Sequence, residues 1–360
     1  MDYDSHGRYL SMAIPRNLNT ITLADVAREA GVSLKTASRA LNEERYVKEK
    51  TAAKVREVMT RLGYRPNELA RGLKARKSSA IGMIVPNLSD PFTANAVKAV
   101  QEVARTNGHI VILASSGGYA DIERSEVQSL IGRQIDGLVI APADSRQDNV
   151  SDIIPPGLHV VTYDQPIHGA QFDSVTIPNR RSAKAATEHL LGHGYKRIVA
   201  IGARPDLYTC SERITGYREA MKKNALESRT CLVEHETQLT SEWLSDVVFK
   251  HQKADAIICM NWVCTMLTLR GMRQIGKRPG FDVPFLSFDD FDLADMMTPS
   301  ISAVRQPTET FGTEAANLLF DRIKGDVGNE RRSMILPTEL VLRESCGCPA
   351  LDSQPAKRRR

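Results

Sequence analysis

The sequence has no long hydrophobic run, because polar residues interrupt its apolar stretches after four to seven residues. A membrane-spanning helix needs about 20 consecutive apolar residues, so we expect none. The first twenty residues contain no continuous apolar segment, and Asp2 and Asp4 stand where a secretory signal peptide carries basic residues. We therefore expect the chain to stay in the cytoplasm, with residues 1–19 forming a disordered N-terminal extension.

Cysteine is also scarce: the chain has 6, and none lies in the C-x-x-C spacing of a structural zinc site. Cys346 and Cys348 could bind a metal or oxidise, but in a reducing compartment we interpret all six as reduced thiols. His189 and His193 stand four residues apart, as two metal ligands on a helix can. Gly194 follows them and indicates a helix end, so we interpret His193 as a cap. We expect no metal site and no cofactor.

The common catalytic signatures are missing as well. The sequence contains no P-loop, no G-x-G-x-x-G after a predicted strand, no G-x-S-x-G elbow and no H-E-x-x-H pair. These absences argue against an enzyme. A free solute-binding protein is the second alternative, but such a protein needs export, and the missing signal peptide argues against it.

Negative charge is scarce near one end of the chain. Residues 16–77 hold 15 lysines and arginines against 7 aspartates and glutamates, although the net charge of the whole chain is only +5. Such a basic module suits binding to nucleic-acid phosphates, although a solvated helical surface would carry similar charge. With 360 residues, the chain can hold this module and a two-lobed body of about 270 residues.

Residues 20–66 have the pattern of three short helices. Thr22 and Ser33 can each cap a helix, and Gly31 and Gly63 can each end one. The predicted helices cover residues 23–30, 34–41 and about 50–62. In the second helix, the inward stripe is Ala37, Ala40 and Leu41, and the outward residues are Leu34, Lys35, Thr36, Ser38 and Arg39. A tight turn between two such helices is typical of a helix-turn-helix that enters the major groove.

These residues resemble the lactose-repressor/galactose-repressor family of transcription regulators. The motifs that carry the resemblance are Thr22–Ala27, Ala30–Ser33, Thr36–Asn42 and Leu62–Asn67. The resemblance implies a DNA-binding repressor whose second helix reads bases. It implies DNA contacts by Thr22, Ser33, Leu34, Lys35, Thr36, Ser38, Arg39, Asn42 and Thr51. Of these, Leu34, Lys35 and Arg39 would lie at the base edges, while the short polar side chains would contact phosphates.

Two positions depart from the family pattern. Ala37 stands where the family usually has valine, and Lys48 stands where it usually has a serine that can cap the third helix. Neither change removes a base-reading group. We therefore expect a slightly less stable module with the same function.

Residues 67–77 form the next segment. Asn67 can cap the stretch from Glu68 to Leu73, which is too short to be a stable helix alone. A plain linker is one interpretation. The resemblance instead implies a hinge helix in which Asn67, Ala70 and Leu73 contact DNA, with Leu73 as a wedge inserted between bases in the minor groove.

From Ile81 onward, short apolar runs alternate with amphipathic stretches. The runs cover residues 81–85, 110–113, 137–140, 160–163, 198–201, 256–259 and 285–288. The amphipathic stretches include residues 94–105, 122–134, 181–193 and 216–223. This alternation predicts an α/β body of parallel sheets with helices on both faces.

The resemblance extends from residue 20 to about residue 348 and implies a body like a periplasmic sugar-binding protein. The implied effector-binding domain covers residues 78–350 in two lobes. The first lobe takes residues 78–177 and 308–336, and the second takes 178–307 and 337–350. Three crossings between lobes make a hinge that can close on a ligand. Residues 351–360 form a basic tail without a leucine heptad, so we expect a homodimer rather than a tetramer.

Polar side chains follow the predicted strands, at the edge where parallel sheets bind ligands. The resemblance implies effector contacts by Ser89, Phe92, Asp164, Arg213, Asn261 and Asp289. Trp262 is a further candidate because it replaces the family's usual aspartate, and it would either stack on a sugar ring or plug the cleft. These residue types suit a sugar or a sugar acid, although some of them could instead cap helices or bridge the lobes. Inducer and corepressor both remain open.

Overall fold

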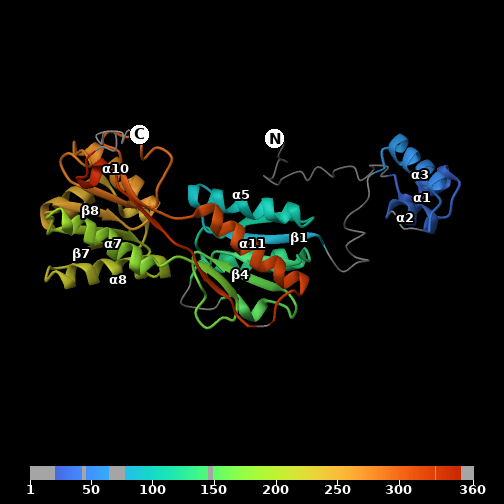
Figure 1. Ribbon diagram of the computed structural model, residues 1–360, viewed down its shortest axis with the longest axis horizontal. Helices are drawn as coiled ribbons and strands as arrows, with labels where there is room; N and C mark the ends of the chain where they lie inside the picture. Colours follow the sequence, from blue (N-terminus) through green and yellow to red (C-terminus); the bar gives the residue numbers. More distant parts are fainter. Residues whose placement is uncertain (1–20, 43–45, 65–77, 145–148, 329, 350–360) are drawn as a thin grey trace, which may run out of the picture. The chain divides into compact units, whose positions relative to one another are not determined.

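The computed structural model describes residues 21–42, 46–64, 78–144, 149–328 and 330–349. The chain divides into two compact units, Met1–Arg76 and Lys77–Arg360, which we call the head and the body. The ribbon diagram in Figure 1 is coloured along the sequence, with the head in blue. Within the described residues, no helix combines the length and the apolarity that crossing a membrane requires.

Among its described residues, the head contains three helices: α1 (Leu23–Ala30), α2 (Leu34–Leu41) and α3 (Glu49–Leu62). The limits of these three helices agree with the sequence-based prediction, except that α3 starts one residue earlier. Gly31 and Gly63 end α1 and α3 with φ angles of 67° and 66°, which glycine adopts without steric cost.

Side-chain hydrogen bonds cap the N-terminal ends of two of these helices. Thr22 and Asp25 form a reciprocal capping box at α1, and the Ser33 hydroxyl accepts a hydrogen bond from the Thr36 amide at α2. Lys48 at the start of α3 makes no such bond in the described structure, as its residue type predicts. The buried residues between the helices include Val26, Ala30, Ala37, Ala40 and Val55.

The body is built on two six-stranded sheets. The first sheet has the order β11-β5-β4-β3-β1-β2. Its strands are β1 (Ala80–Val85), β2 (Ile110–Ser115), β3 (Gly137–Ile140), β4 (His159–Tyr163), β5 (Asp173–Thr176) and β11 (Ser333–Ile335). Successive side chains of β1 point to opposite faces of the sheet and pack into two different hydrophobic cores. Met83 packs toward α5 (Pro91–Thr106) and α11 (Thr308–Lys324), whereas Ile84 packs toward α6 (Ala120–Gly132).

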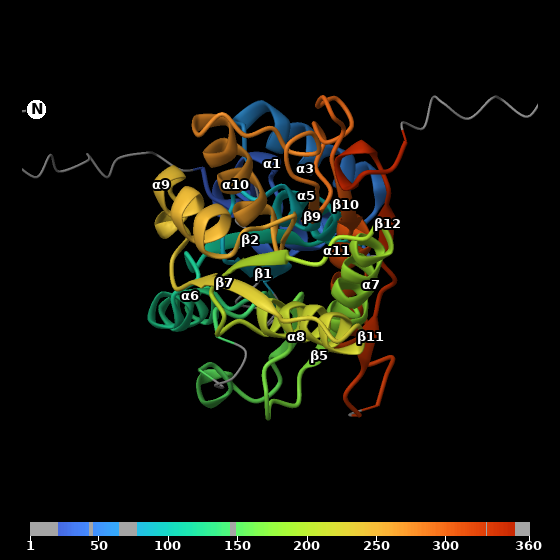
Figure 2. The same cartoon turned by 90° about the vertical axis from the view of Figure 1, so that its left-hand side faces the viewer.

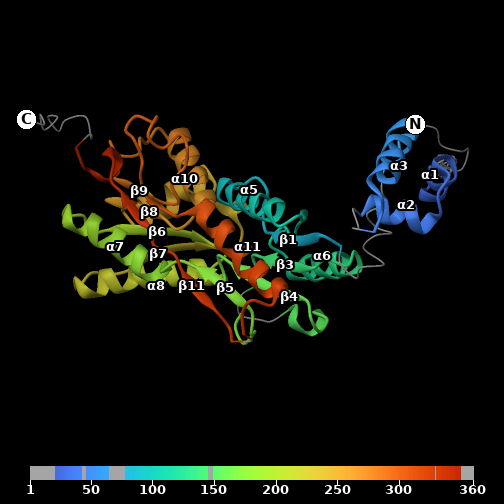
Figure 3. The same ribbon diagram turned by 45° about the vertical axis from the view of Figure 1, so that its right-hand side comes forward.

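The second sheet has the order β12-β10-β9-β8-β6-β7. Its strands are β6 (Ile198–Ala203), β7 (Arg229–Val233), β8 (Ala256–Cys259), β9 (Phe285–Phe288), β10 (Ser302–Arg305) and β12 (Glu339–Val341). Figure 3 shows α7 (Asn179–Gly192) and α8 (Tyr208–Lys223) on one side of it and α10 (Trp262–Gln274) on the other. Short α9 (Ser241–Trp243) and the π-helix η3 (Leu244–His251) pack beside α10.

The chain passes between the sheets three times: after β5, after β10 and after β11. The predicted fold class is therefore confirmed as a small helical head followed by an α/β body of two sheets. One feature differs from a purely parallel arrangement, because β12 pairs antiparallel with β10 at the edge of the second sheet. An antiparallel edge strand on a mostly parallel sheet is common in such folds.

The apolar runs do not predict five of the strands: β5, β7, β10, β11 and β12. Three of them, β7, β11 and β12, lie at sheet edges, and β5 contains the polar pair Asp173-Ser174. The prediction also starts α8 at Gly216, whereas the helix begins at Tyr208. The first turns of α8 carry polar residues such as Ser211 and Glu212, which hide the helical period in the sequence.

Candidate functional site

The outer face of α2 in the head carries the predicted base-reading residues. The Leu34 side chain is 53% exposed, although leucine usually lies in a core, and Lys35 is exposed beside it. Arg39 is half-buried. Because Ala37 and Ala40 hold the opposite face of the helix in the core, α2 offers this face to a partner. The DNA contacts themselves stay a prediction.

The hydroxyl groups near α2 have a structural role as well. Ser33 Oγ lies 3.1 Å from the Thr36 amide nitrogen and 2.8 Å from Thr36 Oγ1. Thr22 Oγ1 donates to Asp25 Oδ2 at 2.6 Å. A change at Ser33 or Thr22 therefore removes a helix cap in addition to any phosphate contact.

The other predicted DNA contacts of the head differ in their exposure. Asn42 is exposed at the end of α2, whereas Ser38 and Thr51 are half-buried. Three predicted DNA contacts of the hinge segment lie outside the described residues: Asn67, Ala70 and Leu73.

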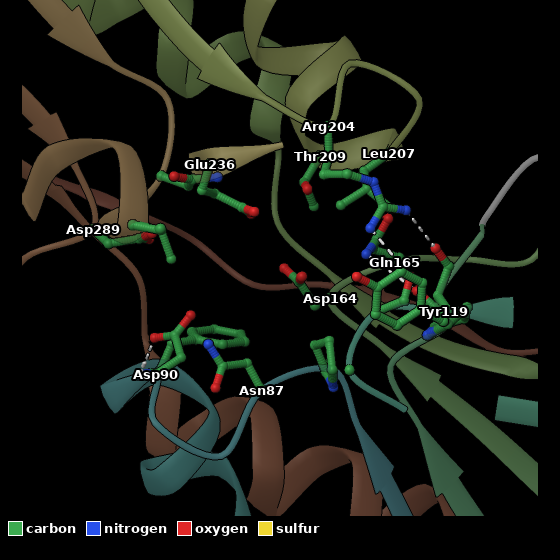
Figure 4. A pocket seen from close by; sticks show the side chains of 18 of the residues that line it. Asn87, Asp90, Tyr119, Asp164, Gln165, Arg204, Leu207, Thr209, Glu236 and Asp289 are labelled. Carbon is green, nitrogen blue, oxygen red and sulfur yellow. Dashed lines mark hydrogen bonds between the residues drawn. The ribbon is translucent and has the colours of Figure 1, made fainter. Parts of the chain in front are cut away.

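In the body, a cavity of about 440 Å³ lies where the carboxyl ends of both sheets meet. Figure 4 shows side chains from both sheets pointing into it. The residues shortly after five strands line it: Asn87 and Asp90 after β1, Asp164 after β4, Arg204 after β6, Asn261 after β8 and Asp289 after β9. This is the edge at which parallel sheets bind ligands.

Four carboxylate side chains line the cavity, and three of them, Asp90, Asp164 and Asp289, influence one another. Burial, reinforced by the negative charge of Asp289, raises the pKa of Asp90 to about 7. Burial also raises the pKa of Asp164 to about 6, although the neighbouring positive charge of Arg213 opposes that shift. Asp164 and Asp289 both have positive φ angles, 64° and 83°. Strained backbone at strand ends is typical of ligand sites.

Arg213 is held rigidly at the wall of the cavity. Its Nε donates to Asn179 Oδ1 and its Nη1 donates to the Met260 carbonyl oxygen, each at 2.7 Å. Its guanidinium carbon lies 3.8 Å from the centre of the Phe288 ring. Among the residues that the structure describes, no hydrogen bond engages Nη2 of Arg213. The protein therefore orients the Arg213 side chain, and its Nη2 group can donate to a ligand.

Two amide oxygens at the cavity lack partners. Gln165 Oε1 and Gln306 Oε1 are buried and accept no hydrogen bond from any described residue, although both side chains line the cavity. The amide nitrogens of the same side chains donate to the Pro142 carbonyl and to Asp289. Since buried acceptors are normally satisfied, these two oxygens indicate donors that a ligand or water would supply.

Arg204 joins the two lobes directly. It follows β6 of the second sheet and donates to the carbonyl oxygens of Gly118 (3.1 Å) and Ala143 (3.3 Å), which follow strands of the first sheet. Asp206 accepts from the same guanidinium at 3.0 Å. The cavity is therefore bordered by a polar contact that spans both lobes.

One predicted effector residue caps a helix, which is the alternative role considered for these residues, and a second accepts a hydrogen bond from the first turn of the same helix. Asn261 Oδ1 accepts from the Cys264 amide at 2.8 Å and begins α10, although the side chain also lines the cavity. Asp289 Oδ2 accepts from the Trp262 amide at 3.0 Å. Both side chains also line the cavity, so a structural role does not exclude ligand contact.

Two predicted effector residues lie elsewhere. Trp262 lines a neighbouring cavity of about 510 Å³, which shares Asp90, Phe92 and Asp289 with the first. Ser89 is exposed, and its amide donates to Asn87 Oδ1; within the described part of the chain it lines neither cavity. The turn after β1 thus directs Asn87 and Asp90 inward in place of Ser89.

The prediction missed several residues of the cavity: Asn87, Asp90, Tyr119, Gln165, Arg204, Glu236 and Gln306. Asp90 and Arg204 carry the same signal as the residues that were predicted, because each is a charged side chain shortly after a strand. Asp90 also precedes Pro91, a frequent start of a helix, and its side chain caps α5. Gln306 directly follows β10, but no apolar run predicts that strand, so the same rule does not find this residue.

Comparison with known proteins gives matches to both units. Residues 22–67 match the model for bacterial regulatory proteins of the lacI family, and residues 187–346 match the periplasmic binding protein-like domain. The transcriptional repressor PurR of Photobacterium profundum is 29% identical over 329 residues, which cover 90% of this chain and 98% of the relative.

Two solved structures are similar over most of the chain. The lac repressor dimer bound to operator and an anti-inducer has a TM-score of 0.79 at 21% identity, covering 91% of this chain and 99% of that one. The transcriptional regulator CelR in complex with cellobiose has a TM-score of 0.66 at 28% identity, covering 90% and 99%.

Proposed function

Since the chain belongs to the lactose-repressor/galactose-repressor (LacI) family of DNA-binding transcription regulators, we propose that it is a repressor controlled by a neutral, sugar-like effector in the cavity of its body. Membership of this family confirms the expectation that the chain is not an enzyme. The proposal assigns residues 20–66 to DNA binding, 67–77 to the hinge and 78–350 to effector binding. It places the protein in the cytoplasm as a homodimer.

The excess of hydrogen-bond acceptors around the cavity carries the effector proposal. Asp90, Asp164 and Asp289 accept hydrogen bonds when ionised, and the oxygens of Gln165 and Gln306 lack donors among the described residues. A ligand with several hydroxyl groups supplies the missing donors. Each hydroxyl can also accept a bond in return, which suits the Nη2 group of Arg213.

Aromatic side chains favour the same class of ligand. Phe92 and Tyr119 line the cavity beside the carboxylates, and Phe92 packs against Phe311 with ring centres 5.3 Å apart. A sugar ring has an apolar face that such rings can cover. The cellobiose complex of CelR, a relative with 28% identity, supports this class of ligand.

A sugar acid is the second candidate, favoured only by the two arginines. Its carboxylate would need to face Arg213, because Arg204 already pairs with Asp206 and bridges the lobes. The four carboxylates of the lining, Asp90, Asp164, Glu236 and Asp289, repel an anion when they are ionised. We therefore rank the neutral sugar ahead of the sugar acid.

The proposed regulation couples lobe closure to DNA binding. Hydrogen bonds of a ligand to side chains of both lobes would favour one closed state, and Arg204 stands among the contacts that such a state includes. An effector that prefers one state must change operator affinity by the same factor by which operator changes effector affinity. An inducer lowers operator affinity, and a corepressor raises it.

A thermal-shift screen of the full chain tests the effector class. The panel would contain neutral sugars, sugar acids, nucleobases and nucleosides, because a ligand that binds only the folded protein raises its melting temperature. A neutral sugar is the expected hit. Its binding should be lost in Asp164→Asn and kept in Asp121→Asn, a matched change at an exposed position of α6. A hit confined to nucleobases would contradict the proposal.

The pH dependence of effector binding separates the two sugar classes. Asp164 and Asp90 have pKa values of about 6 and about 7, so both become ionised acceptors as pH rises through this range. Affinity for a neutral sugar should therefore rise between pH 5 and pH 8, by up to roughly tenfold per pH unit below the pKa. Affinity for a sugar acid should fall over the same range. Calorimetry at four pH values decides between them.

A further inference from the structure

Four potential metal ligands lie together in the second lobe, away from the effector cavity. They are His189, His193, Cys346 and Cys348, and their ligand atoms all lie within 4.8 Å of one another. From the sequence alone we expect no metal site, and the two pairs are far apart in the chain, because Cys348 lies 155 positions after His193. The fold joins them, since the end of α7 lies beside the chain that follows β12. Figure 2 shows α7 and β12 as neighbours, and near the start of α7 the Ser182 hydroxyl is hydrogen-bonded at 2.7 Å to that of Thr338, the residue before β12.

The distances between these atoms fit tetrahedral coordination. Nε2 of His189 lies 3.3 Å from Cys346 Sγ and 3.6 Å from Cys348 Sγ, and Nε2 of His193 lies 3.4 Å from Cys348 Sγ. Zinc bonds of about 2.0–2.1 Å to nitrogen and about 2.3 Å to sulfur place tetrahedral N and S ligands about 3.5 Å apart. A zinc ion therefore requires little movement of these side chains.

Local geometry explains why both pairs converge. His189 and His193 are one turn apart at the end of α7, and the Nε2 atoms of both lie within 3.6 Å of Cys348 Sγ. Gly347 between the cysteines has a φ angle of 97°. A Cβ atom there would lie 2.6 Å from the hydroxyl oxygen of Tyr195. Glycine thus allows the tight turn that brings both sulfurs to the same side.

The surroundings also suit a structural site. Cys346 is fully buried, and the Ser302 hydroxyl donates to its sulfur at 3.0 Å, as outer-sphere partners of metal thiolates do. The Cys346 thiol itself donates to the Arg343 carbonyl at 3.3 Å, a bond that metal binding would give up. Two thiolates and two imidazoles form a closed Cys₂His₂ set, which favours zinc over magnesium or calcium.

We propose that His189, His193, Cys346 and Cys348 bind one zinc ion that ties the C-terminal segment to α7. The segment ends the chain's last passage into the second lobe, whereas α7 begins directly after its first passage. The ion would thereby link the first and last parts of this lobe. Its role is structural, because four protein ligands leave no open position for a substrate.

Cobalt titration of the reduced, metal-free full-length protein tests the site. One equivalent of Co²⁺ per chain should produce the intense visible bands of a tetrahedral ion and a near-ultraviolet sulfur-to-cobalt charge-transfer band. One equivalent of Zn²⁺ should abolish both. His193→Gln and Cys348→Ser are suitable variants, because neither side chain is deeply buried. Each should lower zinc affinity on the order of 100-fold or more, beyond the effect of losing an outer-sphere partner.

Matched variants control for general effects. His251→Gln changes an exposed histidine and Cys231→Ser changes a cysteine of the same lobe, and both should keep wild-type zinc binding. Zinc should raise the melting temperature of these controls and of wild type, but not that of Cys348→Ser. Three results would overturn the proposal: no cobalt bands in wild type, bands that persist in Cys348→Ser, or a Cys346–Cys348 disulfide in protein alkylated directly in cells.

Discussion

In the head, the segment from Thr22 to Asn42 supplies the cap, the core face and the exposed face of α2, the proposed recognition helix. In the body, the side chains around the proposed effector cavity come from positions as distant as Asn87 and Gln306. The head thus exposes its candidate functional groups on helices whose ends and faces are set by residues close together in the sequence. The side chains that line the cavity of the body come from many segments of the chain, and most of them are partly or fully buried. A change in the head should therefore affect mainly the partner, whereas a change in the body should affect both the ligand and the fold.

Arg213→Ala should have the largest effect of the changes considered. It removes a guanidinium that also satisfies Asn179 Oδ1 and the Met260 carbonyl. Because hydrogen bonds to charged groups contribute about 1.5–3 kcal/mol each, effector affinity should fall by roughly 100-fold or more and the melting temperature should drop. Calorimetry and thermal melting measure both effects. Arg218→Ala, an exposed change on the same helix, serves as the control.

This variant also tests the division between head and body. If the effector is an inducer, Arg213→Ala should keep the operator affinity of the unliganded protein while losing the response. If the effector is a corepressor, the variant should fail to bind operator under conditions where wild type binds. Unchanged effector affinity would show that the ligand binds elsewhere.

Gly312→Ala should destabilise the body without touching the cavity. A Cβ atom at this position in α11 would lie 2.2 Å from the Ala96 carbonyl oxygen of α5. Such overpacking costs about 1–3 kcal/mol of unfolding free energy. Gly132→Ala is the control, because a Cβ at the end of α6 meets nothing within 4 Å and should stabilise by up to about 1 kcal/mol. Urea denaturation measures both, and equal effects would contradict the close packing of α5 and α11.

Lys35→Ala should weaken operator binding selectively. Lys35 is exposed on α2, so its loss should leave the fold intact and cost about 1–3 kcal/mol only at particular base pairs. Arg39→Ala should behave similarly, whereas Thr36→Ala should weaken binding to every sequence alike. A binding assay on a library of operator variants distinguishes these patterns. A uniform loss for Lys35→Ala would reassign this residue to the phosphates.

Lys48→Ser should produce the smallest effect, confined to the head. Lys48 precedes α3 without a side-chain hydrogen bond to it, and a serine cap typically contributes about 1 kcal/mol. Hydrogen exchange at the first amides of α3 should slow, and effector affinity should stay unchanged. Lys48→Ala is the matched control without a cap. Equal exchange in both variants would show that the serine does not cap the helix.

The sequence predicts the three described helices of the head to within one residue, because caps and breakers act within a few residues. Thr22, Ser33, Gly31 and Gly63 mark helix ends through contacts with their own neighbours. In the body, continuous apolar runs predict the central strands. Edge strands such as β11 stay hidden, since their pairing with β5 joins Ser333 to Ser174, far away in the chain.

The cavity was predictable in part. Asp164 and Asp289 follow apolar runs, so the rule that parallel sheets bind ligands at their carboxyl ends finds them. The same rule cannot tell which of several polar residues in a turn points inward. Ser89 and Asp90 are adjacent, yet the cap of α5 by Asp90 directs this carboxylate to the cavity and leaves Ser89 exposed.

The helix-turn-helix, the alternation of strands and helices, and the family all follow from the order of the amino acids, because each depends on local spacing and on motifs that stay contiguous in the chain. Which distant groups meet follows only from how the elements pack in three dimensions. His193 and Cys348 are separated by 155 residues, and their side chains approach to 3.4 Å because α7 and the C-terminal segment pack on the same sheet. Contacts of this kind depend on the packing of whole elements, and no pattern within a short stretch of sequence encodes that packing.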